Sequence, residues 1–378
     1  MSKFKVDVSK GRRDSTVSSQ WYSRPGDARF LSLSELETYT TKRSAKLVET
    51  VVAPSKINFQ VRDGALVMEM GDAQIHPTYS AFGQLCAYIH TPAGYMRTLS
   101  ADLAAQCVNH GLKTAAFDAM KMYHSTHQLV GATGENFGRI MDSSVVRAVR
   151  QIAGDGTGDT NWKIPGTISW GEGTYNPYVD ITKDTTTLYA SDRDVFMFLV
   201  DDTRPISIGK LASGDDDLVF RGFYAWNSEI GGQVLGLSTF LLRGVCQNRN
   251  LWGVQDQVTF KIRHTRGAPL RFDQMFGAQL TSYAEASTKP IEDKVAEAKR
   301  RVVAGTDEQR VEFLRKVGLT RVQAAAAIKR GVEEEGKPPS SIWDMTCAIT
   351  ALARYMPTTD TRVSLEKQAG LLMDRVRI

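Results

Sequence analysis

Short stretches of alternating apolar and polar residues fill the chain between residues 187 and 264. β-Branched and aromatic side chains concentrate there, and Gly- or Asp-rich breaks separate the stretches. A period of two places successive side chains on opposite faces of a strand, so this region predicts one antiparallel sheet. From residue 268 to the end the apolar spacing becomes helical, which predicts helices packed on one face of the sheet or beside it. The expected fold class is therefore α+β.

A smaller region ahead of this sheet combines both patterns. Residues 30–50 predict a short helix that begins at Ser32 or Ser34, because a hydroxyl there can cap the first turn. Residues 47–75 alternate as in a strand meander, and residues 78–130 have helical spacing. The sequence thus predicts a smaller α+β N-terminal region.

Composition shifts divide the chain further. The start is basic and polar, as in a flexible arm, and a stretch rich in Gly, Pro, Asn and Asp separates the two patterned halves. The predicted segments are a basic flexible arm at 1–20, an N-terminal α+β region at 21–152, a loop or connection at 153–180, a central β-sheet plus helix at 181–305 and a C-terminal helical region at 306–378.

The C-terminal region contains two capping-box patterns, which begin at Thr306 and at Thr320, with Gly318 between them as a helix stop. Together they resemble a helix-turn-helix, whose second helix would expose a set of polar side chains to nucleic acid. That set is Arg321, Gln323, Lys329 and Arg330. The alternative is an ordinary helical hairpin that covers the core.

Motifs for catalysis or for a cofactor are not recognisable in the chain. The Gly-rich stretch 154–160 lacks the lysine of a phosphate-binding loop, and no serine-hydrolase elbow occurs. His124 and His127 are three residues apart, but no third metal ligand lies near them. The sequence therefore predicts no metal and no cofactor, and it favours a protein that is not an enzyme.

The four cysteines, Cys86, Cys107, Cys246 and Cys347, are far apart in the sequence and suggest buried thiols in a reducing compartment. No apolar segment follows the basic start as a secretory signal would require, and no apolar run is as long as the roughly 18 residues of a membrane span. We expect a cytoplasmic protein without a membrane partner.

Charge is unevenly distributed. The chain has a formal net charge of +5. Between residues 242 and 271 there are six basic residues and a single acid, Asp256. Aromatic residues lie in or beside this segment, and single-stranded nucleic acid needs this combination, because cations follow the phosphates and rings stack on bases. The candidate nucleic-acid-binding residues are Arg243, Arg249, Lys261, Arg263, His264, Arg266 and Trp252. The alternative is that the tryptophans belong to the core and the arginines form a solvated rim.

The alternation also predicts how one strand presents its side chains. Lys261 and Arg263 share a parity and lie on one face, whereas Phe260 and Ile262 lie on the other. We therefore expect a packed face and a charged face that is open to solvent or to a groove between subunits.

Several long segments resemble one family across the whole chain. They include WYSRPGDARFLSLSEL, FGQLCAYIHTPAGYMRTLSADLAAQCVN, NFGRIMDSSVVRAVRQI, TTTLYASDRDVFMFLVDD, GFYAWNSEIGGQVLGLSTFLLRGVCQNRNLWG and IWDMTCAITALAR. This pattern is similar to that of phage/plasmid-like proteins with a domain of unknown function. The resemblance implies residence on a phage, plasmid or prophage, hence in a bacterial host cytoplasm, but implies no reaction.

At the level of fold, strands 187–264 followed by a long helix resemble the core of single-strand annealing proteins of the Rad-fifty-two and Red-beta type. That resemblance implies a homo-oligomer, in the form of a ring, that holds single-stranded DNA without metal or nucleotide. Two alternatives stay open: a phage-derived structural or interaction protein, and an enzyme whose site is assembled from residues distant in the sequence.

Overall fold

The computed structural model describes the greater part of the chain, with several gaps. The described residues are 26–70, 73–157, 160–164, 168–169, 174–175, 181–183, 186–210, 214, 216–243, 260–356 and 359–376.

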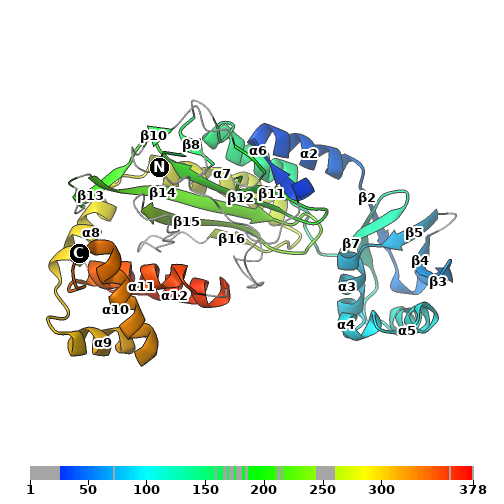
Figure 1. Ribbon diagram of the computed structural model, residues 1–378. Helices are drawn as coiled ribbons and strands as arrows, with labels where there is room; N and C mark the ends of the chain where they lie inside the picture. The colour runs from blue at the N-terminus through cyan, green and yellow to red at the C-terminus, as the bar shows by residue number, and fades with distance from the viewer. Residues whose placement is uncertain are drawn as a thin grey trace.

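The centre of the molecule is an antiparallel sheet with the strand order β1-β11-β12-β14-β15-β16, to which β13 adds beside β14 and β8 beside β12 (Figure 1). The strands are β1 (Arg29–Phe30), β8 (Trp162–Lys163), β11 (Leu188–Ala190), β12 (Val195–Asp201), β13 (Ile206–Lys210), β14 (Asp216–Asn227), β15 (Leu235–Arg243) and β16 (Phe260–Ile262). The predicted antiparallel sheet within 187–264 and the α+β class are confirmed. The sheet also contains β1 and β8, which lie outside that range.

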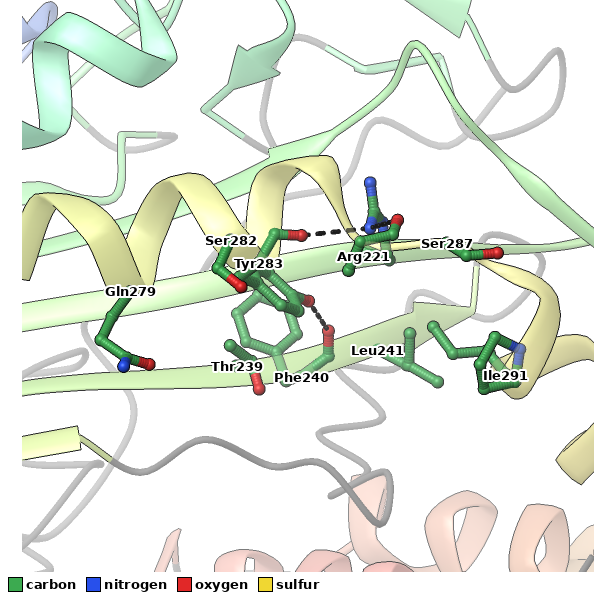
Figure 2. Close-up of a pocket in the computed structure, with 11 residues that line it drawn as sticks. Arg221, Thr239, Phe240, Leu241, Gln279, Ser282, Tyr283, Ser287 and Ile291 are labelled. Atoms are coloured by element: carbon green, nitrogen blue, oxygen red, sulfur yellow. Dashed lines mark hydrogen bonds between the residues drawn. The ribbon is translucent and has the colours of Figure 1, made fainter.

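Helices cover one face of this sheet. They are α2 (Leu33–Ala45), α6 (Asp142–Ala153) and α7 (Ala268–Glu285), and their apolar side chains share one core with Leu199, Phe223 and Leu237 of the strands. The Tyr283 hydroxyl of α7 donates to the Gly222 carbonyl at 3.0 Å. It also lies 3.4 Å from the Phe240 carbonyl, as Figure 2 shows. The first helix begins where it was predicted to begin, since the Ser32 side chain accepts from the backbone of Glu35.

Residues 48–134 form a separate α+β unit that is inserted between α2 and α6 (Figure 1). Its sheet has the order β2-β6-β7-β5-β4-β3 and is antiparallel except for the β5–β7 pair. The elements are β2 (Val48–Val52), β3 (Asn58–Arg62), β4 (Ala65–Met70), β5 (Ala73–Pro77), α3 (Tyr79–Tyr88), α4 (Ala93–Met96), α5 (Ala101–Lys113), β6 (Met120–His124) and β7 (Gln128–Gly134). Because α2 and α6 pack on the central sheet, the structural unit is shorter than the segment 21–152.

The helical spacing predicted for 78–130 is wrong after α5. Residues 120–134 form the β6–β7 hairpin, and β6 also pairs with β2. Met120, Met122 and Leu129 are buried against the helices of the insertion. Pairing with a strand far away in the sequence, rather than local periodicity, fixes the conformation here.

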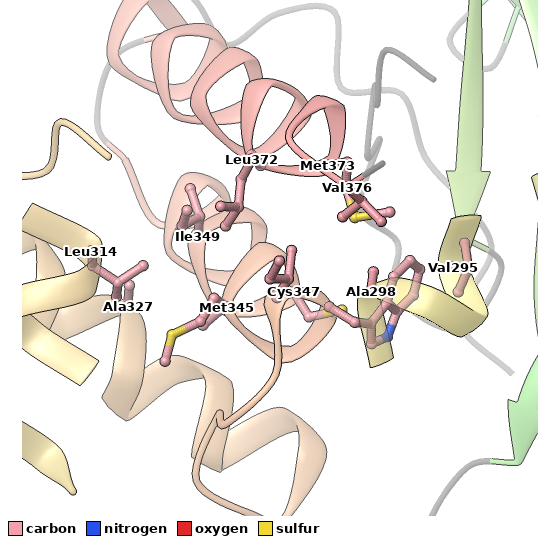
Figure 3. Close-up of a cluster of buried hydrophobic side chains, with 14 of the residues drawn as sticks. Val295, Ala298, Leu314, Ala327, Met345, Cys347, Ile349, Leu372, Met373 and Val376 are labelled. Carbon is pink, nitrogen blue, oxygen red and sulfur yellow. The ribbon is translucent and has the colours of Figure 1, made fainter. Parts of the chain in front are cut away.

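The C-terminal helices form a second core, which also contains Ile206, Val219 and Leu241 of the central sheet (Figure 3). These helices are α8 (Lys289–Arg300), α9 (Asp307–Lys316), α10 (Arg321–Glu335), α11 (Ile342–Arg354) and α12 (Thr359–Asp374). Both predicted capping boxes are present, at Thr306 and at Thr320. However, α10 packs against α11, where Gly331 lies so close to Ala348 that a Cβ would come within 2.9 Å of it. The region is a helical hairpin on the core, and we withdraw the recognition-helix hypothesis.

Candidate nucleic-acid interface

The last strand of the sheet presents one charged and one packed face. In β16, which pairs antiparallel with β15, Lys261 lies opposite Gly236 and Ile262 opposite Leu235. Ile262 is buried in the core beneath α7, and the Phe260 ring lies 6.5 Å from that of Phe276. Lys261 therefore points to the other face, and it is exposed, as is Arg263.

Neither cation is neutralised by an acid in the described part of the chain. Among the residues that the structure describes, no acid forms an ion pair with Lys261 or with Arg263. Exposed and unpaired, the two side chains are available to phosphate oxygens.

Strand pairing brings an aromatic side chain close to Lys261. Gly236 pairs with Lys261 on one side and with Trp226 on the other, so the three residues form one row across the sheet. The Trp226 ring extends over Gly236, where an added Cβ would meet it at 2.0 Å. The glycine thus leaves room for the indole to extend toward the strand that carries Lys261. Trp226 itself is half-buried.

Trp226 is one end of a larger aromatic cluster. It stacks on Tyr224, with ring centroids 5.4 Å apart and planes inclined by 24°. Tyr224 in turn lies 5.9 Å from Phe196 and 6.2 Å from Phe240. Burial raises the pKa of Tyr224, and a hydrogen bond to Ser238 opposes that rise. The buried phenylalanines hold the tyrosine, which in turn supports the indole.

Two further cations of the basic segment lie where β16 leads into α7. The exposed Arg266 donates to the side-chain oxygen of Asn136 at 2.7 Å. Arg271 donates to the Thr265 hydroxyl at 2.6 Å and to the Arg263 carbonyl at 3.2 Å. The Arg271 bonds hold this segment to the start of α7, and the Arg266 bond ties it to the connection that follows the insertion, so the positive surface lies near the junction of the two units.

His264 has a different position from its neighbours. It is half-buried, its ring stacks on Phe137 at 4.8 Å, and its Nδ1 lies 3.0 Å from the Gly138 carbonyl oxygen. Burial lowers the pKa of this imidazole, although the contact with Gly138 opposes the shift. The structure places His264 in the joint between sheet and insertion rather than on the exposed surface with Lys261.

Part of the predicted site cannot be located. Arg249 and Trp252 lie outside the described residues. Arg243 ends β15, where its backbone pairs with Val219, but its side chain is likewise outside the described part.

The chain matches no protein-family model, no curated protein and no solved structure. None of the described helices is long and apolar enough to cross a membrane. Across the described residues, no group of three or more His, Cys, Asp or Glu side chains is arranged to hold a metal ion.

Sequence reasoning missed a buried ion cluster at the base of the insertion. Arg43 forms ion pairs with Asp142 and with Glu229, and Arg139 also pairs with Glu229 at 3.3 Å. Both carboxylates are at most 1% exposed. Burial raises the pKa of Asp142, and the Arg43 guanidinium opposes the rise.

Neighbouring polar groups complete this cluster. The Asn227 amide donates to Asp142 at 2.6 Å, and the Ser44 hydroxyl donates to Glu229 at 2.8 Å. Two cations and two carboxylates balance one another, so the arrangement favours a structural role. No local sequence pattern predicts this cluster, because its members come from α2, the segment before α6, α6 itself and the end of β14.

Proposed function

We propose that this protein binds single-stranded nucleic acid, with DNA preferred, and that it binds or anneals strands in the recombination or replication of a mobile element. The observation that carries the proposal is the row across the sheet in which exposed Lys261 is followed by Gly236 and by half-buried Trp226. A phosphate at Lys261 and Arg263 would leave its base near an indole that already stacks on Tyr224.

Single strands suit this surface better than duplex. An aromatic ring can stack only on a base that has left its own stack, and a duplex would have to be opened first. The resemblance to phage and plasmid proteins supports the placement in a mobile element. The fold-level resemblance to annealing proteins supports a homo-oligomer that carries the strand in a basic groove.

The first test is charge reversal at the two exposed cations. We expect Lys261→Glu with Arg263→Glu to abolish binding of a single-stranded oligonucleotide, measured by gel shift or fluorescence anisotropy at two salt concentrations. Single neutralisations should reduce the salt slope by roughly 0.7 per lost phosphate contact. Duplex of the same sequence should bind more weakly.

A matched control comes from the insertion. Lys56 and Lys113 are exposed there, so Lys56→Glu with Lys113→Glu changes the net charge equally without touching the sheet. We expect this variant to bind nearly as well as the wild-type chain. Equal affinity of the two folded double mutants would refute the proposal and leave a structural or interaction protein as the better interpretation.

Annealing is a separate step and needs its own measurement. Two complementary labelled strands should pair faster with the wild-type chain than with the Lys261→Glu, Arg263→Glu variant. Binding without acceleration would limit the function to strand protection.

A further inference from the structure

A cavity of about 380 Å³ lies between α7 and β15, on the face of the sheet opposite to Lys261. Figure 2 shows Gln279 and Ser282 extending from α7 above Thr239 and Phe240 of β15, with Ser287 and Ile291 at one end. Its volume falls in the range of pockets that take small organic groups.

Three polar side chains line this cavity. Thr239 is buried, Gln279 is half-buried and Ser282 is exposed. In the described part of the chain, none of the three side chains forms a hydrogen bond. A ligand that enters the cavity could therefore exchange hydrogen bonds with all three. Hydroxyl and amide groups offer both donors and acceptors.

The remaining walls are apolar and fixed. Leu241 and Ile291 contribute apolar surface, and Tyr283 is held by its bonds to the strand carbonyls. Arg221 also lines the cavity, but it is 1% exposed and its guanidinium is already paired with Asp201 at 3.1 Å. No acid is among the described lining residues. The cavity therefore suits an uncharged group that combines flat apolar faces with a polar edge.

We propose that this cavity receives an unstacked base of the bound single strand. The inference rests on the proposed function and adds a second contact to it. A nucleobase is uncharged, is apolar on its faces and carries donors and acceptors on its edge, which Gln279, Thr239 and Ser282 can satisfy. Thr239 is three residues from Gly236 on the same strand, a distance of roughly 10 Å. The base site thus lies near the row that carries Lys261 when measured along β15, on the opposite face of the sheet.

Nucleosides test this site apart from the phosphate surface, because they carry no phosphate. Adenosine, guanosine, cytidine and thymidine are titrated against the full chain by ligand-observed NMR. We expect saturable binding of at least one, weakened about fivefold by Thr239→Val and by Gln279→Leu, since each removes a hydrogen bond. Gln274→Leu, at an exposed position of the same helix, should bind like the wild type.

The outcomes separate the two proposals. The Lys261→Glu, Arg263→Glu variant should keep its nucleoside affinity while losing the oligonucleotide. If no nucleoside binds, or if Thr239→Val, Gln279→Leu and Gln274→Leu bind alike, the base site is refuted whatever the oligonucleotide result. If Thr239→Val does not fold, Ser282→Ala replaces it, with the same expected loss. Nucleoside binding with no affinity for any oligonucleotide would refute the proposed function and leave a nucleoside pocket.

Discussion

Two groups of positive charge in this protein have opposite surroundings. Lys261 and Arg263 are exposed, and no described acid pairs with them. Arg43 and Arg139 lie against two buried carboxylates, and their side chains are only 11% and 10% exposed. The comparison shows that solvent access and partners, rather than the number of charges, decide what a cation does. The buried group ties α2, α6 and the end of β14 together at the base of the insertion, whereas the exposed group remains available to a polyanion.

The largest expected effect is the loss of stability when the buried group is mutated. Glu229→Ala would leave both arginines buried without that carboxylate, and breaking a buried ion pair costs about 3–5 kcal/mol of unfolding free energy. Urea denaturation measures this. Lys261→Gln with Arg263→Gln should stay within about 0.5 kcal/mol of the wild type, as surface changes usually do. Similar losses in the two variants would show that the buried cluster does not stabilise the fold as we describe.

A smaller effect, on nucleic-acid affinity, is expected at Trp226, which lies in the same row as Lys261. Trp226→Leu removes the stacking ring but keeps apolar bulk, and it should weaken single-strand binding by about 1–3 kcal/mol for the base concerned. Trp226→Phe keeps a ring and should lose less. Anisotropy titrations at one salt concentration compare the three proteins. An unchanged affinity in the leucine variant would assign Trp226 to the core alone.

The smallest effect concerns pH at the joint between the two units. Burial holds the pKa of His264 below its ordinary value of 6.5. Above that value both the folded and the unfolded chain are neutral at this residue, so its contribution to stability is fully present. As pH falls through 6.5, the unfolded chain takes up the proton first, and stability is lost until the folded pKa is reached.

His264→Phe isolates the contribution of His264 protonation to stability, because phenylalanine keeps a ring to stack on Phe137 and cannot titrate. Urea midpoints at about pH 7.5 and pH 5.5 should fall further for the wild type than for the variant. A parallel fall in both proteins would mean that other groups govern the acid response.

The features predicted correctly from sequence are those that short spacing encodes. The two capping boxes need only residues three apart, and the faces of β16 follow from alternation between Phe260 and Arg263. The features that were missed depend on distant partners. Residues 120–134 become a hairpin because β2 supplies a neighbouring strand, and the row from Lys261 to Trp226 exists only once β14, β15 and β16 are in register.

Dependence on distant partners also explains why the sequence did not reveal the buried cluster or the cavity. Arg43 and Glu229 are 186 residues apart in the chain, and the basic run that contains Arg43 looks like an ordinary helix C-terminus. Thr239 and Gln279 look like ordinary polar positions in a strand and a helix until α7 is placed over β15. His264, by contrast, was included with the exposed cations because of its neighbours in sequence, and its surroundings in space are those of a joint.

The insertion of residues 48–134 also bears on how the chain folds as it leaves the ribosome. All strands of the inserted unit are available once residue 134 has emerged, whereas Arg29 must wait for Tyr189, and β16 completes the central sheet only at residue 262. Because chains are made from the N-terminus and domains fold as units, the inserted unit is ready first. Until the late strands arrive, β1 and α2 have no sheet to pack on. The nascent chain thus contains a folded inserted unit between two segments that have not yet folded. Because the ends of that unit are close together, the effective loop that β1 must close to reach the central sheet is shorter.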